Sequence, residues 1–336
     1  MKNGYERFVR PLLFSLDAET AHQLAVRLLC GASHFNVALR ALKSFQPPSN
    51  PKTVFGINFS NPIGLAAGLD KNGVALRAWA ALGFGFVEIG TVTAKAQPGN
   101  PKPRIFRLAA QQALINRLGF NNDGADVIAD RLRRLRTSQR WPTVPVGINI
   151  GKSRATPLEQ ATDDYLYSFR LLREFADYIT LNVSSPNTPG LRELQEPQKL
   201  SELLHAIGKE GGATLKPVVV KISPDLSGAE LKAILAVCGE NGVTGIIATN
   251  TTLDHSSIAP QLDQSGGLSG APLRDKSTAF VRKIAARSTI PVIGSGGIVD
   301  AESAREKFHA GAQLIQLYTG LVYRGPGLIR EIIEEL

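Results

Sequence analysis

The sequence predicts an α/β protein built as a (β/α)8 barrel, or TIM barrel, with a small helical extension at its N-terminus. From about residue 60 onward, eight short apolar runs alternate with segments of helical periodicity, which is typical of right-handed βαβ units and a parallel sheet. Several runs are apolar almost throughout, as expected for parallel strands buried on both faces. An open doubly wound sheet is the alternative, but eight units without a glycine-rich fingerprint in the first favour closure.

The elements follow one another in a regular order. The predicted strands are 62–67, 84–90, 145–150, 178–183, 217–222, 245–249, 290–294 and 313–318. The predicted helices are 74–82, 126–136, 164–175, 198–207, 229–238, 273–287, 301–308 and 327–333. The stretch 91–140 is too long for one βα unit and contains a Pro/Gly-rich loop at 97–103, so we expect an insertion over the mouth of the barrel.

Residues 1–50 precede the barrel and are predicted to form two short helices followed by a proline-rich linker at 46–51. This division leaves 51–336 as the barrel domain. Asp17 is placed to cap the second helix. The apolar residues of each helix recur every four positions, namely Phe8, Leu12 and Leu16, then Leu24 and Leu28.

Composition limits the class of protein. The 336 residues are 43% hydrophobic and 20% charged, which excludes a disordered chain. The two cysteines, Cys30 and Cys238, exclude a disulfide framework and fit a reducing compartment. The net charge of +9 allows nucleic acid, an anionic membrane or anionic small molecules as partners. The arginine-rich stretch 131–136 has no interleaved aromatic residues, so we expect a solvated helix face and no nucleic-acid partner.

The active site of a barrel lies at the carboxyl ends of its strands, and here those ends carry Asn, Lys, Ser, Thr and Gly. The absence of clustered His, Cys and Glu predicts no metal site. Asparagine amides suit a planar ligand that alternates N–H and C=O groups, and lysines suit a carboxylate or phosphate. The glycine-rich ends of the seventh and eighth strands, 294–297 and 318–320, predict a phosphate site, with simple tight turns as the alternative.

Five strings at these strand ends and in the insertion together resemble dihydroorotate dehydrogenase, and more narrowly its class 2, the membrane-associated, quinone-dependent form. The strings are AAGLDKNG at 66–73, EIGTVT at 88–93, NRLGFNN at 116–122, NVSSPNTPG at 182–190 and GGLSG at 266–270. The resemblance covers essentially the whole chain and is weakest in the first 50 residues.

This resemblance implies an FMN-dependent oxidoreductase that oxidises (S)-dihydroorotate to orotate, the fourth step of de novo pyrimidine (UMP) biosynthesis, with ubiquinone or menaquinone as electron acceptor. It implies that Ser185 is the base that removes the C5 proton, while the hydride from C6 goes to flavin N5. Class 1 members carry Cys at this position, so Ser185 marks class 2. An N-cap or turn serine before Pro186 is the alternative.

The resemblance also implies three sets of binding residues. Those expected to bind FMN are Ala67, Gly68, Leu69, Asp70, Lys71, Thr91, Asn149, Asn182, Lys221, Thr249, Gly270, Gly297, Tyr318 and Thr319. Those expected to bind dihydroorotate are Lys71, Asn116, Arg117, Leu118, Gly119, Phe120, Asn182, Asn187, Asn250 and Thr251. Those expected at the quinone site are His22, Arg107 and Tyr318, although a helix residue such as His22 could also simply face solvent.

The N-terminal helices are expected to bind an anionic membrane surface. Residues 1–45 hold six Lys or Arg against three Asp or Glu beside exposed apolar candidates, an interfacial amphipathic composition. The resemblance implies peripheral association with the cytoplasmic face of the cell inner membrane, and a monomer is compatible with the sequence. Two other functions stay open from the residues alone: a soluble phosphate-binding barrel such as an aldolase or isomerase, and a non-catalytic basic membrane-binding protein.

Overall fold

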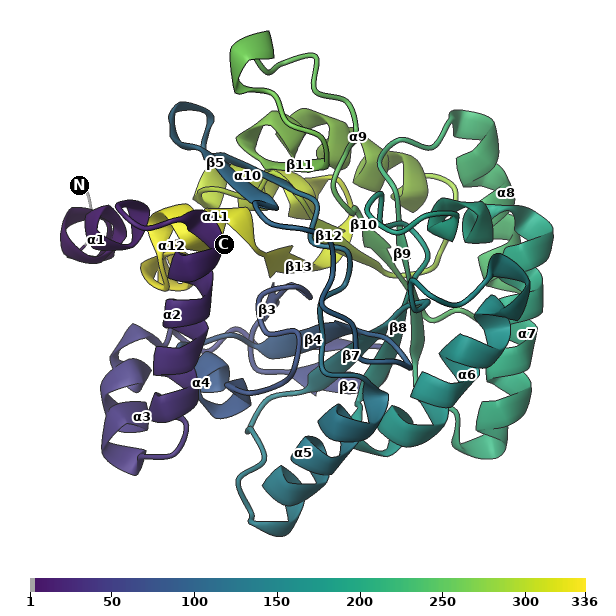
Figure 1. Cartoon of the computed structure of the whole chain (residues 1–336), viewed down its shortest axis with the longest axis horizontal. Coiled ribbons are helices and arrows are strands. Elements are labelled where there is room, and N and C mark those ends of the chain that lie inside the picture. The colour runs from purple at the N-terminus through teal and green to yellow at the C-terminus, as the bar shows by residue number, and fades with distance from the viewer. Residues whose placement is uncertain (1–3) are drawn as a thin grey trace.

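The computed structural model describes residues 4–336 and contains a closed barrel of eight parallel strands in the order β10-β12-β13-β3-β4-β7-β8-β9 (Figure 1). The predicted fold class is therefore confirmed, and each predicted apolar run overlaps one barrel strand. The barrel strands are β3 (Ile63–Leu65), β4 (Phe86–Val92), β7 (Val146–Ile150), β8 (Tyr178–Asn182), β9 (Val218–Ile222), β10 (Gly245–Ala248), β12 (Val292–Ser295) and β13 (Ala312–Leu317).

Helices cover the outside of the barrel, and each predicted helical segment is confirmed. They are α4 (Leu76–Ala81), α5 (Ala125–Thr137), α6 (Ala161–Leu172), α7 (Pro197–Gly211), α8 (Gly228–Glu240), α9 (Arg274–Ala285), α10 (Ala301–His309), α11 (Thr319–Arg324) and α12 (Gly327–Glu334). Capping boxes fix the N-terminal ends of two helices, Ser227 with Glu230 at α8 and Asp300 with Ser303 at α10. The main core fills the layer between these helices and the strands.

A hairpin that the sequence analysis missed closes the other end of the barrel. Strands β1 (Lys52–Val54) and β2 (Ile57–Phe59) pair antiparallel through a turn in which Phe55 and Gly56 both have positive φ, 56° and 74°. Phenylalanine is unusual in such a turn, which hides the hairpin in the sequence. The hairpin packs its apolar residues against side chains inside the barrel, including Phe86 and Tyr178.

The N-terminal segment differs from the prediction of two short helices. A π-helical turn (Tyr5–Val9) continues into α1 (Arg10–Phe14), followed by α2 (Ala18–Ala32) and a third helix, α3 (Asn36–Leu42). Asp17 caps α2 as predicted, because its carboxylate accepts from the backbone N–H groups of Glu19 and Thr20. The short α3 was missed because the four-residue apolar repeat ends at Leu28. Residues 1–3 of the predicted segment 1–50 lie outside the described residues.

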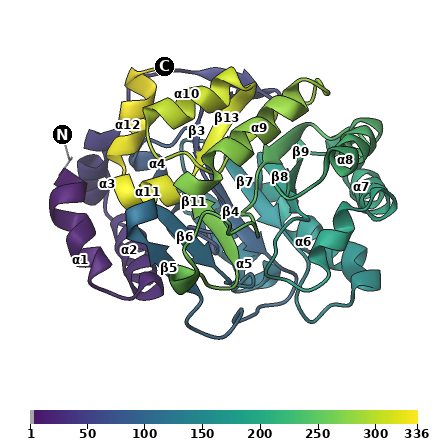
Figure 2. The ribbon, with the colours of Figure 1, turned by 90° about the horizontal axis from the view of Figure 1, so that it is seen from above.

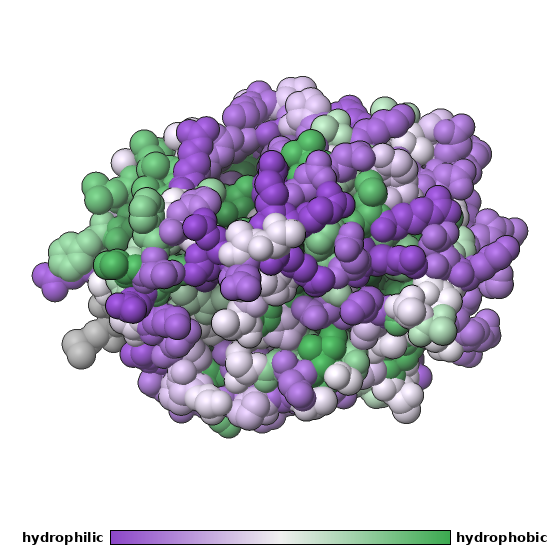
Figure 3. Space-filling view, turned by 90° about the horizontal axis from the view of Figure 1, so that it is seen from below, coloured by the Kyte–Doolittle hydropathy of each residue, from purple (hydrophilic) through white to green (hydrophobic). Residues whose placement is uncertain are grey.

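The surface of this segment is unusually apolar. Of the fifteen exposed large hydrophobic side chains among residues 4–336, nine lie between residues 8 and 45, and Leu12 and Val37 are 72% and 77% exposed. Figure 3 shows an apolar area on this side of the molecule. In residues 4–336 we find no helix with the length and apolar character needed to cross a bilayer.

The predicted insertion forms a second, three-stranded antiparallel sheet of β5 (Ile105–Leu108), β6 (Ala113–Asn116) and β11 (Gly267–Gly270). The third strand comes from the long connection after β10, and the sequence analysis did not anticipate it. Figure 2 shows these strands side by side, with α1 and α2 next to β5. The insertion thus brings the N-terminal helices and the mouth of the barrel together.

Candidate active site

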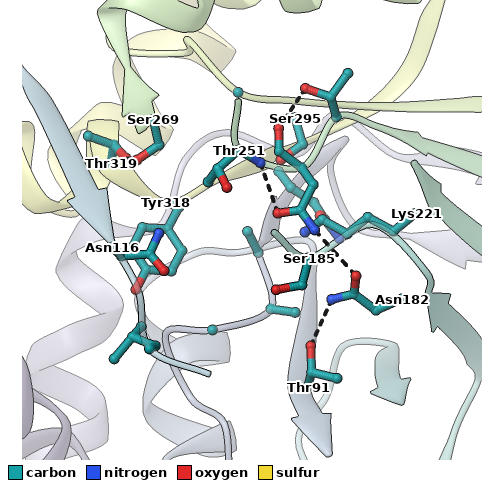
Figure 4. Close-up of a pocket in the computed structure, with 18 of the residues that line it drawn as sticks. Thr91, Asn116, Asn182, Ser185, Lys221, Thr251, Ser269, Ser295, Tyr318 and Thr319 are labelled. Carbon is teal, nitrogen blue, oxygen red and sulfur yellow. Dashed lines mark hydrogen bonds between the residues drawn. The ribbon is translucent and has the colours of Figure 1, made fainter. Parts of the chain in front are cut away.

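A pocket opens at the carboxyl ends of the barrel strands, under the second sheet. It gathers most of the residues that the resemblance assigned to FMN or substrate. The predicted residues that line it are Ala67, Gly68, Lys71, Thr91, Asn116, Leu118, Gly119, Phe120, Asn182, Ser185, Asn187, Lys221, Thr249, Asn250, Thr251, Gly270, Gly297, Tyr318 and Thr319. Figure 4 shows Asn116 and Tyr318 facing Ser185 across the pocket.

Four predicted residues, Leu69, Asp70, Arg117 and Asn149, are not among those that line the pocket. Asp70 is fully engaged elsewhere, because its carboxylate accepts from the backbone N–H groups of Val74 and Ala75 and from Trp79 Nε1. Burial raises the pKa of Asp70, and these three hydrogen bonds oppose that effect. Asp70 was expected to bind FMN, whereas in the structure its carboxylate fixes the start of α4.

The pocket is also lined by residues that were not assigned to FMN or substrate one by one, namely Ala66, Ser269, Leu273, Ser295, Gly296, Ile298 and Gln316. Ala66, Ser269, Ser295 and Gly296 lie within the motifs given above, so those motifs already pointed to them. Gln316 and Gln313 are the two polar residues of β13, and Gln316 is the buried one. This interruption of the apolar run was the signal that could have found it. Its Oε1 is buried and has no hydrogen-bond partner among residues 4–336.

The corner predicted to bind phosphate is lined by backbone and small side chains. Gly297 has φ 73°, and a Cβ added there would lie 2.2 Å from Arg274 Cα, so no other residue fits. The opposite side is closed by Ser269 and Thr319, whose hydroxyl oxygens lie 2.9 Å apart. With Gly296 and Gly270 also in the lining, the ligand can approach the main chain closely here.

A chain of hydrogen bonds leads from the barrel interior to the pocket. Glu88, fully buried in β4, accepts from Asn149 Nδ2 at 2.9 Å. Asn149 Oδ1 accepts from Thr91 Oγ1 at 2.6 Å, and Thr91 Oγ1 accepts from Asn182 Nδ2 at 2.9 Å. Asn182 Oδ1 in turn accepts from Asn250 Nδ2 at 3.3 Å. Because Glu88 accepts the first of these bonds from Asn149 Nδ2, Asn149 Oδ1 is directed at Thr91, and this sets the direction of the bonds that follow.

The other oxygen of Glu88 accepts from three more donors, Tyr178 Oη at 2.9 Å, Thr180 Oγ1 at 3.1 Å and Gln316 Nε2 at 2.8 Å. The bond from Gln316 directs its unpartnered Oε1 away from the carboxylate. Glu88 therefore orients two amides that line the pocket, those of Asn182 and Gln316.

Two lysines bring positive charge to the pocket. Burial lowers the pKa of Lys221, and Glu88 partly offsets this effect. Within the described part of the chain, the Lys221 ammonium has no hydrogen-bond or ion-pair partner. Lys71 Nζ donates to Gly68 O at 3.0 Å, and its pKa is lowered to about 8, first by burial and then by the nearby Arg104. Both ammonium groups are thus available to an anionic ligand.

Ser185 lies on the loop after β8 and is 5% exposed. Its Oγ accepts from the backbone N–H of Asn187 at 3.3 Å. Asn187 Nδ2 donates to Asn116 O at 3.1 Å, which joins the loop after β8 to β6. The serine hydroxyl is therefore held beside amide side chains in a largely desolvated position.

A second pocket lies between α1, α2 and the sheet of β5 and β6, and it contains all three residues predicted for the quinone site, His22, Arg107 and Tyr318. Its other lining residues are mainly apolar, including Leu13, Phe14, Ala18, Ala21, Ala25, Ile105, Leu114 and Val322, with Tyr5. Burial, with a contribution from Lys71, lowers the pKa of His22 to about 3, so its imidazole is neutral. Tyr318 lines both pockets and separates them by one side chain.

Arg107 fixes the position of α1 at this second pocket. Its guanidinium donates to the carbonyl oxygens of Leu13 and Phe14 at 3.0 and 3.3 Å and to that of Leu16. It also lies over the Phe14 ring, 4.5 Å from the ring centre. The cation thus binds the carbonyl end of the helix, where positive charge is favourable.

Comparison with known proteins agrees with this geometry. The family model described as Dihydroorotate dehydrogenase matches residues 51–336. The dihydroorotate dehydrogenase (quinone) of Salinispora arenicola is 53% identical over 337 residues, covering 97% of this chain and 97% of the relative. That of Gloeobacter violaceus is 50% identical over 334 residues, covering 98% and 93%. Ligand-free type DHODH from Eimeria tenella is 36% identical with a TM-score of 0.85, covering 95% and 94%. On this evidence of sequence and structure, the chain belongs to the dihydroorotate dehydrogenase family.

Proposed function

We propose that this protein oxidises dihydroorotate to orotate, with FMN as its cofactor and a quinone as its electron acceptor. The proposal rests on one observation: two adjacent pockets differ in the polarity of their lining. One is lined by amides, hydroxyls, glycines and two lysines, and the other is mainly apolar. The relatives are named dihydroorotate dehydrogenase (quinone). This name indicates a polar substrate, which suits the first pocket, and an apolar electron acceptor, which suits the second.

The first pocket fits a flavin mononucleotide on two observations. The glycine corner at Gly297 suits a phosphate, and the unpartnered Gln316 Oε1 suits an N–H donor. FMN, when bound, supplies the hydride acceptor and the electron carrier. Lys221 would offset negative charge on the reduced flavin, since its buried ammonium lines the pocket and forms no ion pair with any of residues 4–336.

The remaining polar residues suit dihydroorotate, a cyclic ureide that carries a carboxylate. The amides of Asn116, Asn182, Asn187 and Asn250 offer donors and acceptors to the ring, and Lys71 offers a cation to the carboxylate. Ser185 Oγ takes the proton from C5 and passes its own proton to water. Because a serine hydroxyl is a weak base, this step depends on its desolvated position and on stabilisation of the developing charge.

The N-terminal segment, proposed as a unit of residues 1–50 in front of the barrel unit 51–336, would bind the cytoplasmic face of the cell membrane and admit the quinone. Its exposed apolar side chains together with its excess of basic residues suit an anionic interface. A quinone ring and its tail suit the second pocket, with His22 and Arg107 as polar contacts beside Tyr318.

The proposal is tested by anaerobic spectroscopy. The purified protein should be yellow, dihydroorotate should bleach its flavin absorbance, and ubiquinone but not fumarate should restore it. A colourless protein that cannot be reconstituted with FMN would contradict the proposal and favour an aldolase or isomerase.

The role of Ser185 is tested by single-turnover reduction. Ser185→Ala should keep FMN bound and slow flavin reduction by about 10²-fold, the usual scale for loss of a general base. Ser168→Ala, a buried serine on α6 outside the pocket, is the matched control and should reduce at the normal rate. Equal rates in the two variants would remove Ser185 from the proposed role.

A further inference from the structure

A buried ion pair joins helix α2 to the loop 97–104 of the insertion. Arg104 Nε donates to Glu19 Oε2 at 3.0 Å, and Arg104 Nη2 donates to Glu19 Oε1 at 2.7 Å. The two residues are only 5% and 4% exposed. A bidentate pair of this kind fixes both partners in one geometry, because two parallel bonds hold the plane of the guanidinium.

The same guanidinium also binds the loop on which it sits. Arg104 Nη1 donates to Pro98 O at 2.5 Å and to Asn100 O at 2.9 Å. The loop is thus wrapped around a cation whose charge is balanced by Glu19. Lys102 of the same loop also approaches Glu19, at 3.4 Å, but its side chain is 61% exposed.

The loop in turn contacts the segments that line the substrate side of the pocket. Asn100 Nδ2 donates to Arg117 O at 2.9 Å and to Asn187 O at 3.4 Å. The backbone N–H of Asn100 donates to Leu118 O at 3.0 Å, and Gln97 Nε2 donates to Gly119 O at 2.9 Å. Leu118, Gly119 and Asn187 all line the pocket, so the loop is the layer immediately behind them.

We propose that Glu19 is a positioning residue for dihydroorotate: through Arg104 it holds the loop 97–104 against the segments that bind the substrate. The inference rests on the proposed function and adds a second role to α2, whose residues His22 and Ala25 line the other pocket. Without the Glu19 carboxylate, the buried guanidinium keeps its bonds to Pro98 O and Asn100 O but lacks its anion, which favours its movement toward water. The loop then moves with it, and the segments that bind the substrate lose their support.

Electrostatics adds a second effect in the same direction. Glu19 raises the pKa of Lys71, whereas Arg104 lowers it. Asp70 also raises this pKa, and the half-buried His22 is close enough to Lys71 to be affected by it. Loss of the Glu19 charge therefore reduces the protonated fraction of the lysine proposed to bind the substrate carboxylate.

The test compares Glu19→Gln with Lys102→Gln in the reductive half-reaction, measured by anaerobic stopped flow without quinone. Glu19→Gln should raise the dissociation constant for dihydroorotate by about tenfold, while the limiting rate of reduction stays within about twofold, since a displaced binding segment weakens substrate binding. Lys102→Gln removes an exposed contact to the same carboxylate and should leave both constants nearly unchanged.

A second measurement does not depend on turnover. Hydrogen exchange of the backbone amides in 97–104 should be faster in the FMN-bound Glu19→Gln protein than in the wild type and in Lys102→Gln. If Glu19→Gln does not fold, Glu19→Asp keeps the charge with a shorter reach and should shift both readouts in the same direction. An unchanged dissociation constant with unchanged exchange overturns the inference. A wild-type flavin that dihydroorotate does not bleach overturns the proposed function instead.

Discussion

Glu88→Gln is the substitution whose consequences the structure defines most closely. It preserves shape but replaces one acceptor oxygen of a fully buried carboxylate with an NH₂ donor. All four of the present partners donate to that carboxylate, from Asn149, Tyr178, Thr180 and Gln316. The new amide must therefore face one of two conflicts.

If the new NH₂ faces Asn149, the Asn149 amide has to turn over, and the direction of the chain through Thr91 to Asn182 reverses. The reversed Asn182 amide then presents its NH₂ to the NH₂ of Asn250. If the new NH₂ faces the other side, it meets three donors, namely the Tyr178 and Thr180 hydroxyls and Gln316 Nε2. In both cases at least one buried donor is left unpaired, which costs about 1–3 kcal/mol.

That cost falls on the cofactor-binding state, because Asn182 and Gln316 line the pocket. We expect the dissociation constant of FMN for the apoprotein to rise by roughly 5- to 150-fold, the equivalent of 1–3 kcal/mol. The measurement is the quenching of flavin fluorescence in a titration of the apoprotein with FMN. Thr180→Val is the control, because it removes one donor to Glu88 and leaves the direction of the chain intact.

Thr180→Val should therefore bind FMN within about threefold of the wild type, since its apolar replacement leaves no donor unpaired. Two results refute the reasoning. One is an unchanged FMN affinity in Glu88→Gln. The other is an equal loss in Thr180→Val, which would show that any disturbance of this part of the barrel has the same effect.

Three further predictions use other parts of the site. The pKa of Lys71, about 8, implies that its ammonium is present below pH 8 and lost above it. The dissociation constant for dihydroorotate, measured by anaerobic titration, should therefore rise as the pH passes from 7 to 9. A dissociation constant that does not change with pH contradicts this role of Lys71. Leu12→Glu, at a side chain 72% exposed, should reduce sedimentation with phosphatidylglycerol vesicles, whereas Leu253→Glu, 52% exposed on a barrel loop, should not. Gly297→Ala should lower FMN affinity at least tenfold, because the added Cβ meets Arg274 Cα. The control Gly239→Ala in α8 has open space around the added Cβ and should raise the melting temperature slightly. Equal FMN affinity in the two variants would show that the Gly297 corner is not part of the phosphate site.

The barrel could be predicted because its signal is local. Each buried strand is a short apolar run, and the chain repeats strand and helix in a fixed order, so periodicity alone defines the elements. The predicted cap at Asp17 was confirmed for the same reason, since it depends on neighbouring backbone N–H groups. The family motifs also identified most of the residues that line the pocket, because the carboxyl ends of parallel strands meet at one face of a barrel.

What the sequence did not reveal depends on contacts between distant residues. Strand β11 exists because Gly267–Gly270 pairs with Ala113–Asn116, more than a hundred residues earlier. Asp70 was expected to bind FMN, and only the position of Trp79 and of the backbone at the start of α4 shows that its carboxylate oxygens already accept other hydrogen bonds. The hairpin turn at Phe55 carries no turn-forming residue at its first position, because the ring is needed at the end of the barrel beside Tyr178.

The arrangement of the two pockets has a consequence for how the half-reactions are separated. Polar groups that suit a charged ureide face one side of Tyr318, and the apolar cleft under α1 and α2 faces the other. Under the proposed function, a carrier bound in the first pocket would be reached by the two substrates from different directions, so neither would have to leave before the other could approach. The ion pair of Glu19 with Arg104 connects the helix that lines the second pocket with the loop behind the first. Removal of the N-terminal helices would consequently affect both half-reactions, although only one of them uses the quinone.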